Sequence, residues 1–221
     1  MDAVNNAAAT RSARSGSGRR DPERTREQIL EAALIEFSDK GFEGARVDEI
    51  ARRAGSNKRM LYHYFGHKDE LFRAVLERAY ADIREAENEL DLEHLDPVEG
   101  MRRLVCFTFE YSVGNPRFMR LLNDENLHGA RHLRNSDKIR QMHSPLVDLI
   151  ADLLRRGERD GVFRGGVDPV QLYISIAALG YFYFSNIHTL STIFGRDLMA
   201  KLAIEERRDH VVDVILGFLG S

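Results

Sequence analysis

The side chains best suited to chemistry gather in one short stretch of the N-terminal third, and their types suit nucleic acid. The guanidinium of Arg59 can donate two parallel hydrogen bonds to guanine, and Asn57 can pair with adenine if it is not occupied in capping a helix. Tyr62, Tyr64 and Lys68 suit phosphate oxygens, which fix the register of a duplex without reading its sequence. The pattern predicts a surface for double-stranded DNA. The candidate DNA-binding residues are Arg46, Asn57, Lys58, Arg59, Met60, Tyr62, His63, Tyr64 and Lys68.

A second group of side chains has the spacing of metal ligands. His128 and His132 share one face if they lie on a helix, and Glu125 lies one turn earlier. Gly129 weakens that helix, so the favoured interpretation is histidines at the surface or at the edge of a pocket, with no metal. A small all-α metalloenzyme is the alternative. The sequence contains no nucleophile elbow, zinc-protease, phosphate-loop or Cys-x-x-Cys motif, so it predicts neither an enzyme nor a cofactor.

The elements that must position these residues are all predicted to be helices. Asp21 followed by Pro22 is typical of a helix start, and Lys40-Gly41 predicts its end. Apolar residues then recur at intervals of three to four, and strand-like alternation is nowhere convincing. The fold class is therefore all-α, with a bend expected near Pro145. The predicted helices span 21–40, 47–54, 58–64, 68–90, 97–113, 117–127, 136–159, 168–189 and 204–219.

Residues 45–65 have the pattern of a helix-turn-helix. Two short helices are separated by a turn at Gly55, and apolar Ile50 and Leu61 face inward to hold the unit together. In such a unit the first short helix crosses the phosphate backbone and the second lies in the major groove. The sequence thus predicts that Asn57–Tyr64 enters the groove.

Three stretches carry a resemblance to a known family: RTREQILEAALIEFSDKGF, VDEIARRAG and LYHYFGHKDELF. Over roughly residues 24–76 the chain resembles the TetR family of one-component bacterial regulators. The C-terminal half is similar to the subgroup that includes regulators of pyrimidine and nicotinate catabolism. Two departures matter. Ser56-Asn57 and Arg59-Met60 differ from the family's usual residues, so no operator sequence carries over. Arg46 replaces a frequent threonine and either contacts phosphate or stays solvated.

Low-complexity composition at the N-terminus and the resemblance together predict three regions. Residues 1–20 are expected to be a disordered basic arm, which either touches DNA or is a solvated tail. Residues 21–67 form the three-helix DNA-binding head, and residues 68–221 form a larger helical domain for effector binding and dimerisation. The net charge of −3 hides a mildly basic first third and an acidic remainder, which suits a head on DNA and a body away from phosphates.

The larger domain offers candidates for both of its expected roles. The apolar stripe at 211–219 suits either a two-fold dimer interface or the core of one protomer, and the resemblance favours a homodimer on a palindromic operator. Aromatic side chains with polar neighbours suggest a pocket for an unidentified small-molecule effector, although the core is the default place for any single one of these aromatic residues. The candidate pocket residues are Phe107, Tyr111, Asn123, His128, Arg131 and Tyr181.

The expected function is transcriptional regulation, and more specifically repression relieved by the effector. No apolar run approaches the roughly eighteen residues of a membrane span, and the single Cys106 suits a reducing cytoplasm. The alternatives are an activator, the metalloenzyme above, and a protein-interaction module whose helix-turn-helix no longer binds DNA.

Overall fold

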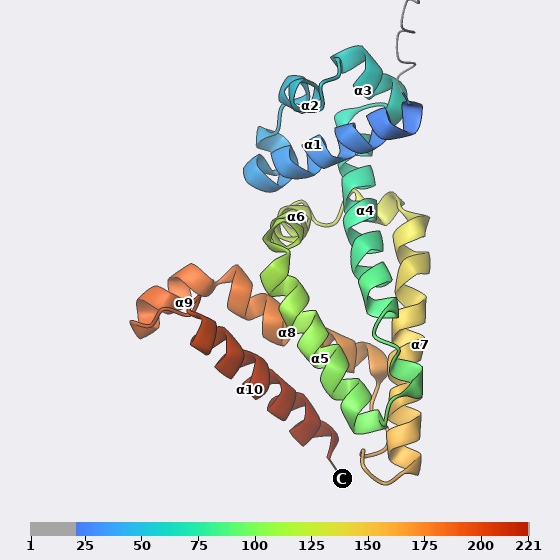
Figure 1. Cartoon of the computed structure of the whole chain (residues 1–221), viewed down its shortest axis with the longest axis vertical. Helices are drawn as coiled ribbons and strands as arrows, with labels where there is room; N and C mark the ends of the chain where they lie inside the picture. The colour runs from blue at the N-terminus through green and yellow to red at the C-terminus, as the bar shows by residue number, and fades with distance from the viewer. Residues whose placement is uncertain (1–20, 221) are drawn as a thin grey trace, which may run out of the picture.

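The computed structural model describes residues 21–220, apart from the side chains of Asn135, His143 and Ser144, and every regular element in that range is helical. The all-α fold class is thus confirmed. The sequence prediction for the arm at 1–20 lies outside the described residues. Figure 1 shows a small head above a larger body, with one long helix, α4 (Lys68–Asn88), running down from the head into the body.

The head consists of α1 (Pro22–Gly44), α2 (Val47–Arg53) and α3 (Lys58–Phe65). The side chain of Asp21 accepts a hydrogen bond from the backbone N–H of Glu23, which caps α1 as the sequence predicts. The predicted end at Gly41 is instead a kink, with φ 69° and ψ 173° at that glycine, and helical turns resume as far as Gly44. A glycine can adopt this backbone conformation without a Cβ clash, so the chain bends without ending.

The body is built from six helices and two short 3₁₀ turns besides the lower part of α4. Its core is the apolar space between α5, α7, α8 and α10, filled by residues such as Met101, Ile150 and Leu172. The elements are η1 (Leu92–His94), α5 (Pro97–Gly114), α6 (Pro116–Leu127), η2 (Leu133–Asn135), α7 (Asp137–Arg159), α8 (Pro169–Ser185), α9 (Ile187–Phe194) and α10 (Lys201–Leu219).

The upper half of α4 belongs to the core of the head. Leu71, Phe72 and Val75 are buried with α1 and α3 side chains, and Leu121 of α6 joins the same cluster. Lower down, α4 packs against α7 of the body, so this one helix is a rigid connection between the two parts. The structure therefore joins the head to the body through packed side chains as well as through the chain itself.

Two helix boundaries differ from the sequence prediction. The helix expected over 168–189 is broken: α8 ends at Ser185, and α9 leaves at an angle of 69°. At the break, the side-chain amide of Asn186 donates to the carbonyl of Phe182, a bond typical of residues that compete with helical pairing. The last helix begins at Lys201, earlier than expected, whereas α7 runs through Pro145 without a break.

Within the described residues, no single helix is long and apolar enough to cross a membrane. The bent pair α8 and α9 meets the criteria of length and composition only when the two helices are taken together.

Candidate DNA interface and effector site

The outer face of α3 is the most direct candidate for contact with DNA. Leu61 and Phe65 are buried against the rest of the head, which fixes the rotation of the helix. Lys58, Arg59 and Tyr62 are therefore turned outward. An apolar inner face and a polar outer face are what a helix in a DNA groove needs.

Asn57 is the N-cap of α3, which limits its role as a base reader. Its side-chain oxygen accepts a hydrogen bond of 2.9 Å from the backbone N–H of Met60. This bond satisfies one of the free N–H groups at the start of the helix. The amide nitrogen of Asn57 remains available to a base or a phosphate, but the paired contact with adenine needs both atoms.

The two cations at the start of α3 differ in their surroundings. Lys58 lies 3.1 Å from Asp48 of α2, and the hydrogen bond with that carboxylate, together with its charge, raises the pKa of Lys58. Among the described side chains, none forms an ion pair or hydrogen bond with the guanidinium of Arg59. Arg59 therefore presents a full set of unpaired donors to solvent.

Three other candidates are partly committed within the head. The ammonium group of Lys68 donates to the carbonyl of Glu43 at 3.3 Å and lies 4.8 Å from the centre of the Phe42 ring. Met60 and Tyr64 are half-buried rather than exposed. The structure thus places these three at the edge of the outer face of α3.

Arg46 is exposed at the N-cap of α2 and has a partner that the sequence did not reveal. Its backbone N–H donates to the carboxylate of Glu36, which is 1% exposed and also 2.8 Å from Lys40. Burial alone would raise the pKa of Glu36, but the hydrogen bonds from Lys40 and Arg46 outweigh burial and lower it. The buried carboxylate fixes the start of α2, and so the direction of the Arg46 side chain.

The remaining DNA-binding candidate, His63, is exposed on α3 beside Tyr64, with 5.4 Å between the ring centres. Tyr62 stands similarly near His67, with 6.4 Å between the ring centres. All nine candidates thus lie in α3, at its N-cap, or at the starts of α2 and α4.

The six pocket candidates, in contrast, do not surround one cavity. Phe107 and Tyr111 pack together on α5, with ring centres 5.6 Å apart. The hydroxyl of Tyr181 on α8 donates to the side-chain oxygen of Asn123 on α6. These four residues lie in the body where α5, α6 and α8 meet.

His128 and Arg131 contact the head instead. Arg131 lies 3.5 Å from Glu43 and over the ring of Phe42, and His128 lies 3.9 Å from Glu43. Beside them the backbone N–H of Phe42 donates to Asp124 at 2.8 Å. Because Phe42 and Glu43 belong to α1, these polar side chains join the body to the head and do not face an effector space in the body.

Glu125 and His132, the other members of the predicted metal alternative, are bonded to each other. Glu125 is 1% exposed and accepts hydrogen bonds from the backbone N–H groups of His132 and Leu133, and its carboxylate lies 2.6 Å from Nδ1 of His132. Across the described residues, no group of three His, Cys, Asp or Glu side chains is arranged to hold a metal ion.

The structure contains a buried ion pair in α4 that the sequence did not predict. Arg84 lies 2.7 Å from Glu87, the two side chains are 10% and 4% exposed, and Nε of Arg84 has no hydrogen-bond partner among the described residues. Burial raises the pKa of Glu87 to about 7, and Arg84 lowers it only in part. The pair lines a cavity of about 200 Å³ between α4 and α7. Its only sequence signal is a pair of charges spaced three apart on a helix with an apolar face.

The apolar stripe of α10 was expected to form either the core of the protomer or a dimer interface. Val211, Val212, Ile215 and Leu219 are buried in the core of the protomer. Phe218 is 44% exposed and borders a groove of about 490 Å³ between α8 and α10. The core explanation therefore holds for four of the five residues.

Comparisons with known proteins agree with this architecture. Residues 29–75 match the family model described as bacterial regulatory proteins, tetR family, and residues 97–215, more than half of the chain, match the tetracyclin repressor-like C-terminal domain. The HTH-type transcriptional repressor NicS of Pseudomonas putida is 39% identical over 203 residues, which are 92% of this chain and 96% of that protein. The repressor SCO4008 of Streptomyces coelicolor is 32% identical over 72% of this chain and 78% of its own.

Solved structures show the same fold. The regulator SCO4942 from Streptomyces coelicolor superposes with a TM-score of 0.65 at 25% identity, over 88% of this chain and 98% of that one. AibR, solved in complex with isovaleryl coenzyme A and operator DNA, superposes with a TM-score of 0.65 at 21% identity, over 86% of this chain and 97% of its own. The predictions of a regulator rather than an enzyme, and of its family, are confirmed. The chain belongs to the TetR family of bacterial regulatory proteins and is a DNA-binding transcriptional regulator.

Proposed function

We propose that the protein is a repressor that acts in the cytoplasm and grips a palindromic operator with α3 of each protomer. The observation that carries this proposal is the unpaired, outward guanidinium of Arg59 on a helix whose opposite face is fully packed. Arg59 reads a base, and Lys58 and His63 stand beside it at the groove. Tyr62 and Lys68 hold phosphates. The names of the relatives NicS and SCO4008 as repressors support repression over activation.

The residue roles are tested by titrating the purified dimer onto DNA from upstream of its own gene. Arg59→Ala should weaken binding by about 1–3 kcal/mol and relax specificity at one base pair. Lys68→Ala should weaken binding to all sequences equally and reduce its dependence on salt. Arg102→Ala, an exposed change on α5 in the body, is the control and should bind normally. Unchanged binding of both head variants would refute the assignment, and salt-independent binding would favour the protein-interaction module.

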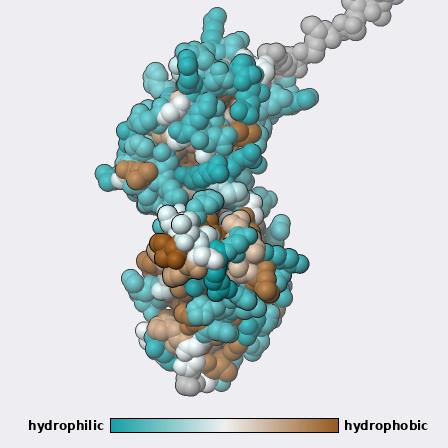
Figure 2. Space-filling view, turned by 90° about the vertical axis from the view of Figure 1, so that its left-hand side faces the viewer, coloured by the Kyte–Doolittle hydropathy of each residue, from teal (hydrophilic) through white to brown (hydrophobic). Residues whose placement is uncertain are grey.

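The geometry of the dimer follows from the exposed apolar residues of the body. Phe182, Val214 and Phe218 are 59%, 40% and 44% exposed along the groove between α8 and α10. In Figure 2 the surface of the head is mostly hydrophilic, whereas apolar residues are spread over the same face of the body. We place the two-fold interface on α8 and α10, where each protomer covers the groove of the other. Phe218→Asp should then produce monomers in sedimentation velocity.

The effector is proposed to be a small organic acid bound beside α4. Arg84 is paired with Glu87, but its Nε has no hydrogen-bond partner among the described residues and lies next to a cavity, and an unsatisfied buried donor favours an anion there. Since α4 is one continuous helix from Lys68 to Asn88, a shift at Arg84 is transmitted to the start of the head.

Nicotinate and uracil are the first probes, because the chain is similar to regulators of nicotinate and pyrimidine catabolism. The charge of Arg84 predicts that nicotinate raises the melting temperature and releases the operator, and that neutral uracil does neither. Arg84→Gln should abolish the response to nicotinate while operator binding persists. A response to uracil alone, or one that survives Arg84→Gln, would contradict an acidic effector at this position.

A further inference from the structure

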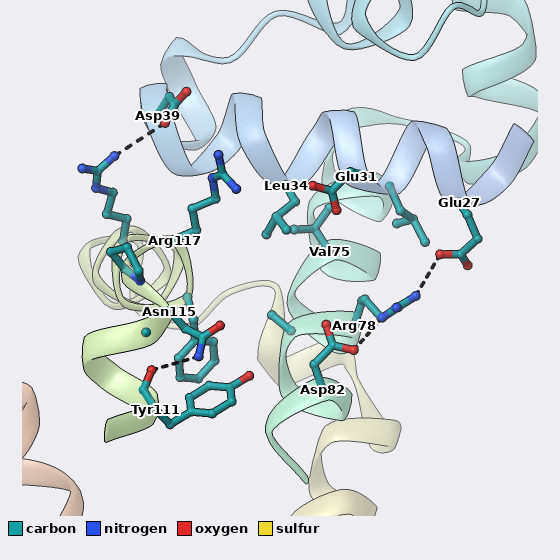
Figure 3. A pocket seen from close by; sticks show the side chains of 16 residues that line it. Glu27, Glu31, Leu34, Asp39, Val75, Arg78, Asp82, Tyr111, Asn115 and Arg117 are labelled. Carbon is teal, nitrogen blue, oxygen red and sulfur yellow. Dashed lines mark hydrogen bonds and ion pairs between the residues drawn. The ribbon is translucent and has the colours of Figure 1, made fainter. Parts of the chain in front are cut away.

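A cleft lies at the junction of head and body, separate from the small cavity beside Arg84 and Glu87. Its volume is about 560 Å³, and it is bordered by α1 on one side and by α4, the end of α5 and the start of α6 on the others (Figure 3). Its apolar lining includes Leu30 and Leu34 from α1, Val75 from α4 and Phe118 from α6. A space of this size holds a small organic molecule.

Two ion pairs bridge head and body on opposite sides of this cleft. Arg78 of α4 lies 2.8 Å from Glu27 of α1, and Arg120 of α6 lies 3.5 Å from Asp39 of α1. Figure 3 shows the two pairs separated by the open space of the cleft. Arg78 also lies 2.6 Å from Asp82, so the carboxylates on both sides of the cleft already have cationic partners.

Two charges in the middle of the cleft have no such partner. Arg117 rises from α6 toward α1, and Glu31 descends from α1 into the cleft (Figure 3). Among the described residues, neither side chain forms an ion pair or hydrogen bond, and they do not pair with each other. The cleft thus presents an unpaired cation on one wall and an unpaired anion on the other, with apolar side chains between them.

Polar groups beside Arg117 reinforce the preference for an anion there. The side chain of Asn115 donates to the carbonyl of Tyr111 instead of capping α6, so the first N–H groups of this helix have no side-chain acceptor. Helix N-termini attract negative charge. Burial raises the pKa of Tyr111 to about 12, so its hydroxyl remains a donor at the base of the cleft.

We propose that this junction cleft is a second ligand site, which binds a small elongated zwitterion with an apolar middle. The anionic end pairs with Arg117, the cationic end pairs with Glu31, and the middle packs on Leu34 and Phe118. Because Glu31 belongs to the head and Arg117 to the body, the ligand completes a third bridge between the two existing ion pairs. This site goes beyond the proposed effector cavity, and its occupant would brace the head against the body.

The test is titration of the full-length dimer, without DNA, with 4-(aminomethyl)benzoate by ligand-observed NMR. Benzoate and benzylamine are probes of the same ring with one charge each. The zwitterion should bind more tightly than either. Arg117→Gln should weaken its binding about tenfold, and Glu31→Gln should weaken it by a similar factor, as expected for loss of one charged contact. Both side chains are exposed, so neither change should alter the melting temperature much.

Two further variants make the result decisive. Arg102→Gln, on the outer surface of α5, is the control and should bind the zwitterion like the unaltered protein, whereas Arg84→Gln reports on the proposed effector cavity. No detectable binding of the zwitterion would overturn the proposal, and so would Arg117→Gln and Glu31→Gln proteins that bind it as tightly as the unaltered protein. Loss of binding only in Arg84→Gln would also overturn it, because the ligand would then lie beside α4. Since no DNA is present, failure of the repressor proposal would not affect this outcome.

Discussion

The head and the body distribute charge and apolar surface in opposite ways. The head keeps its apolar side chains inside and turns unpaired cations such as Arg59 outward. The body buries an ion pair, Arg84 with Glu87, and leaves Phe182 and Phe218 exposed. A surface of free cations needs a polyanion, whereas exposed aromatic rings and a buried guanidinium need a second protomer and a ligand. The surface of the head is therefore suited to DNA, whereas the surface of the body is suited to a second protomer.

Removing the buried carboxylate between the two regions should have the largest effect on stability. Glu125→Ala leaves two backbone N–H groups and the ring of His132 without their acceptor, and breaking a buried pair of this kind costs about 3–5 kcal/mol. Urea unfolding measures the loss. Glu85→Ala, an exposed change on α4, should stay within about 0.5 kcal/mol of the unaltered protein. Equal stability of the two variants would show that this contact contributes nothing.

The buried ion pair of the body should make stability depend on pH. The pKa of Glu87 is about 7 in the folded protein and near 4.5 when unfolded, so the folded state holds the proton more tightly. Stability from this group is fully present below pH 4.5 and is lost as pH rises to about 7, by up to about 3 kcal/mol. Glu87→Gln should remove that loss in calorimetric scans from pH 4.5 to 7.5. Parallel curves for the two proteins would refute the assignment.

The kink of α1 should tolerate no side chain. At Gly41 a Cβ would lie 2.8 Å from Oδ1 of Asp124, and the backbone has φ 69° and ψ 173°, a region open essentially to glycine alone. Gly41→Ala should destabilise the protein by about 1–3 kcal/mol. Gly114→Ala is the matched control, because a Cβ there meets nothing within 4 Å and the backbone is helical. A stable Gly41→Ala protein would mean that the contact between head and body shifts easily.

The smallest effect is expected at the start of α3, where stability and DNA reading can be separated. Asn57→Ala should cost about 1 kcal/mol of stability, because the Met60 N–H loses its acceptor. Asn57→Ser keeps the cap and removes the amide nitrogen, so it should preserve stability. If Asn57→Ser also preserves operator affinity, Asn57 is a structural cap and not a DNA contact. Thermal unfolding and DNA titration together give the answer.

The sequence predicted the head well because the forces that shape it are local. Apolar residues at helical spacing, the Asp21 cap and the turn at Gly55 all act within a few residues of one another. The kink at Gly41 was missed because it depends on Asp124, whose side chain meets the backbone of Phe42 across 82 residues of chain. No periodicity in the sequence carries that information.

The candidate site residues also differ in whether their positions depend on local helical geometry or on packing between distant elements. The outer face of α3 follows from helical geometry alone, so its residues could be named in advance. His128 and Arg131 have the polar character of pocket residues, but their position against Phe42 and Glu43 depends on how two separate elements pack. Arg84 was overlooked because a charged residue on an amphipathic helix is normally solvated, and only the packing of α7 against α4 buries it.

The sharing of one hydrophobic core by α1, α4 and α6 limits how this protein can be recombined with others. Leu121 is buried among the side chains of the head, although it lies far beyond the head in sequence. A chimera that takes only residues 21–67 from this protein would lose that contact and the bond from Phe42 to Asp124. Exchange of DNA specificity between relatives should therefore succeed when α6 travels with the reading head, or when only the outward residues of α3 are replaced.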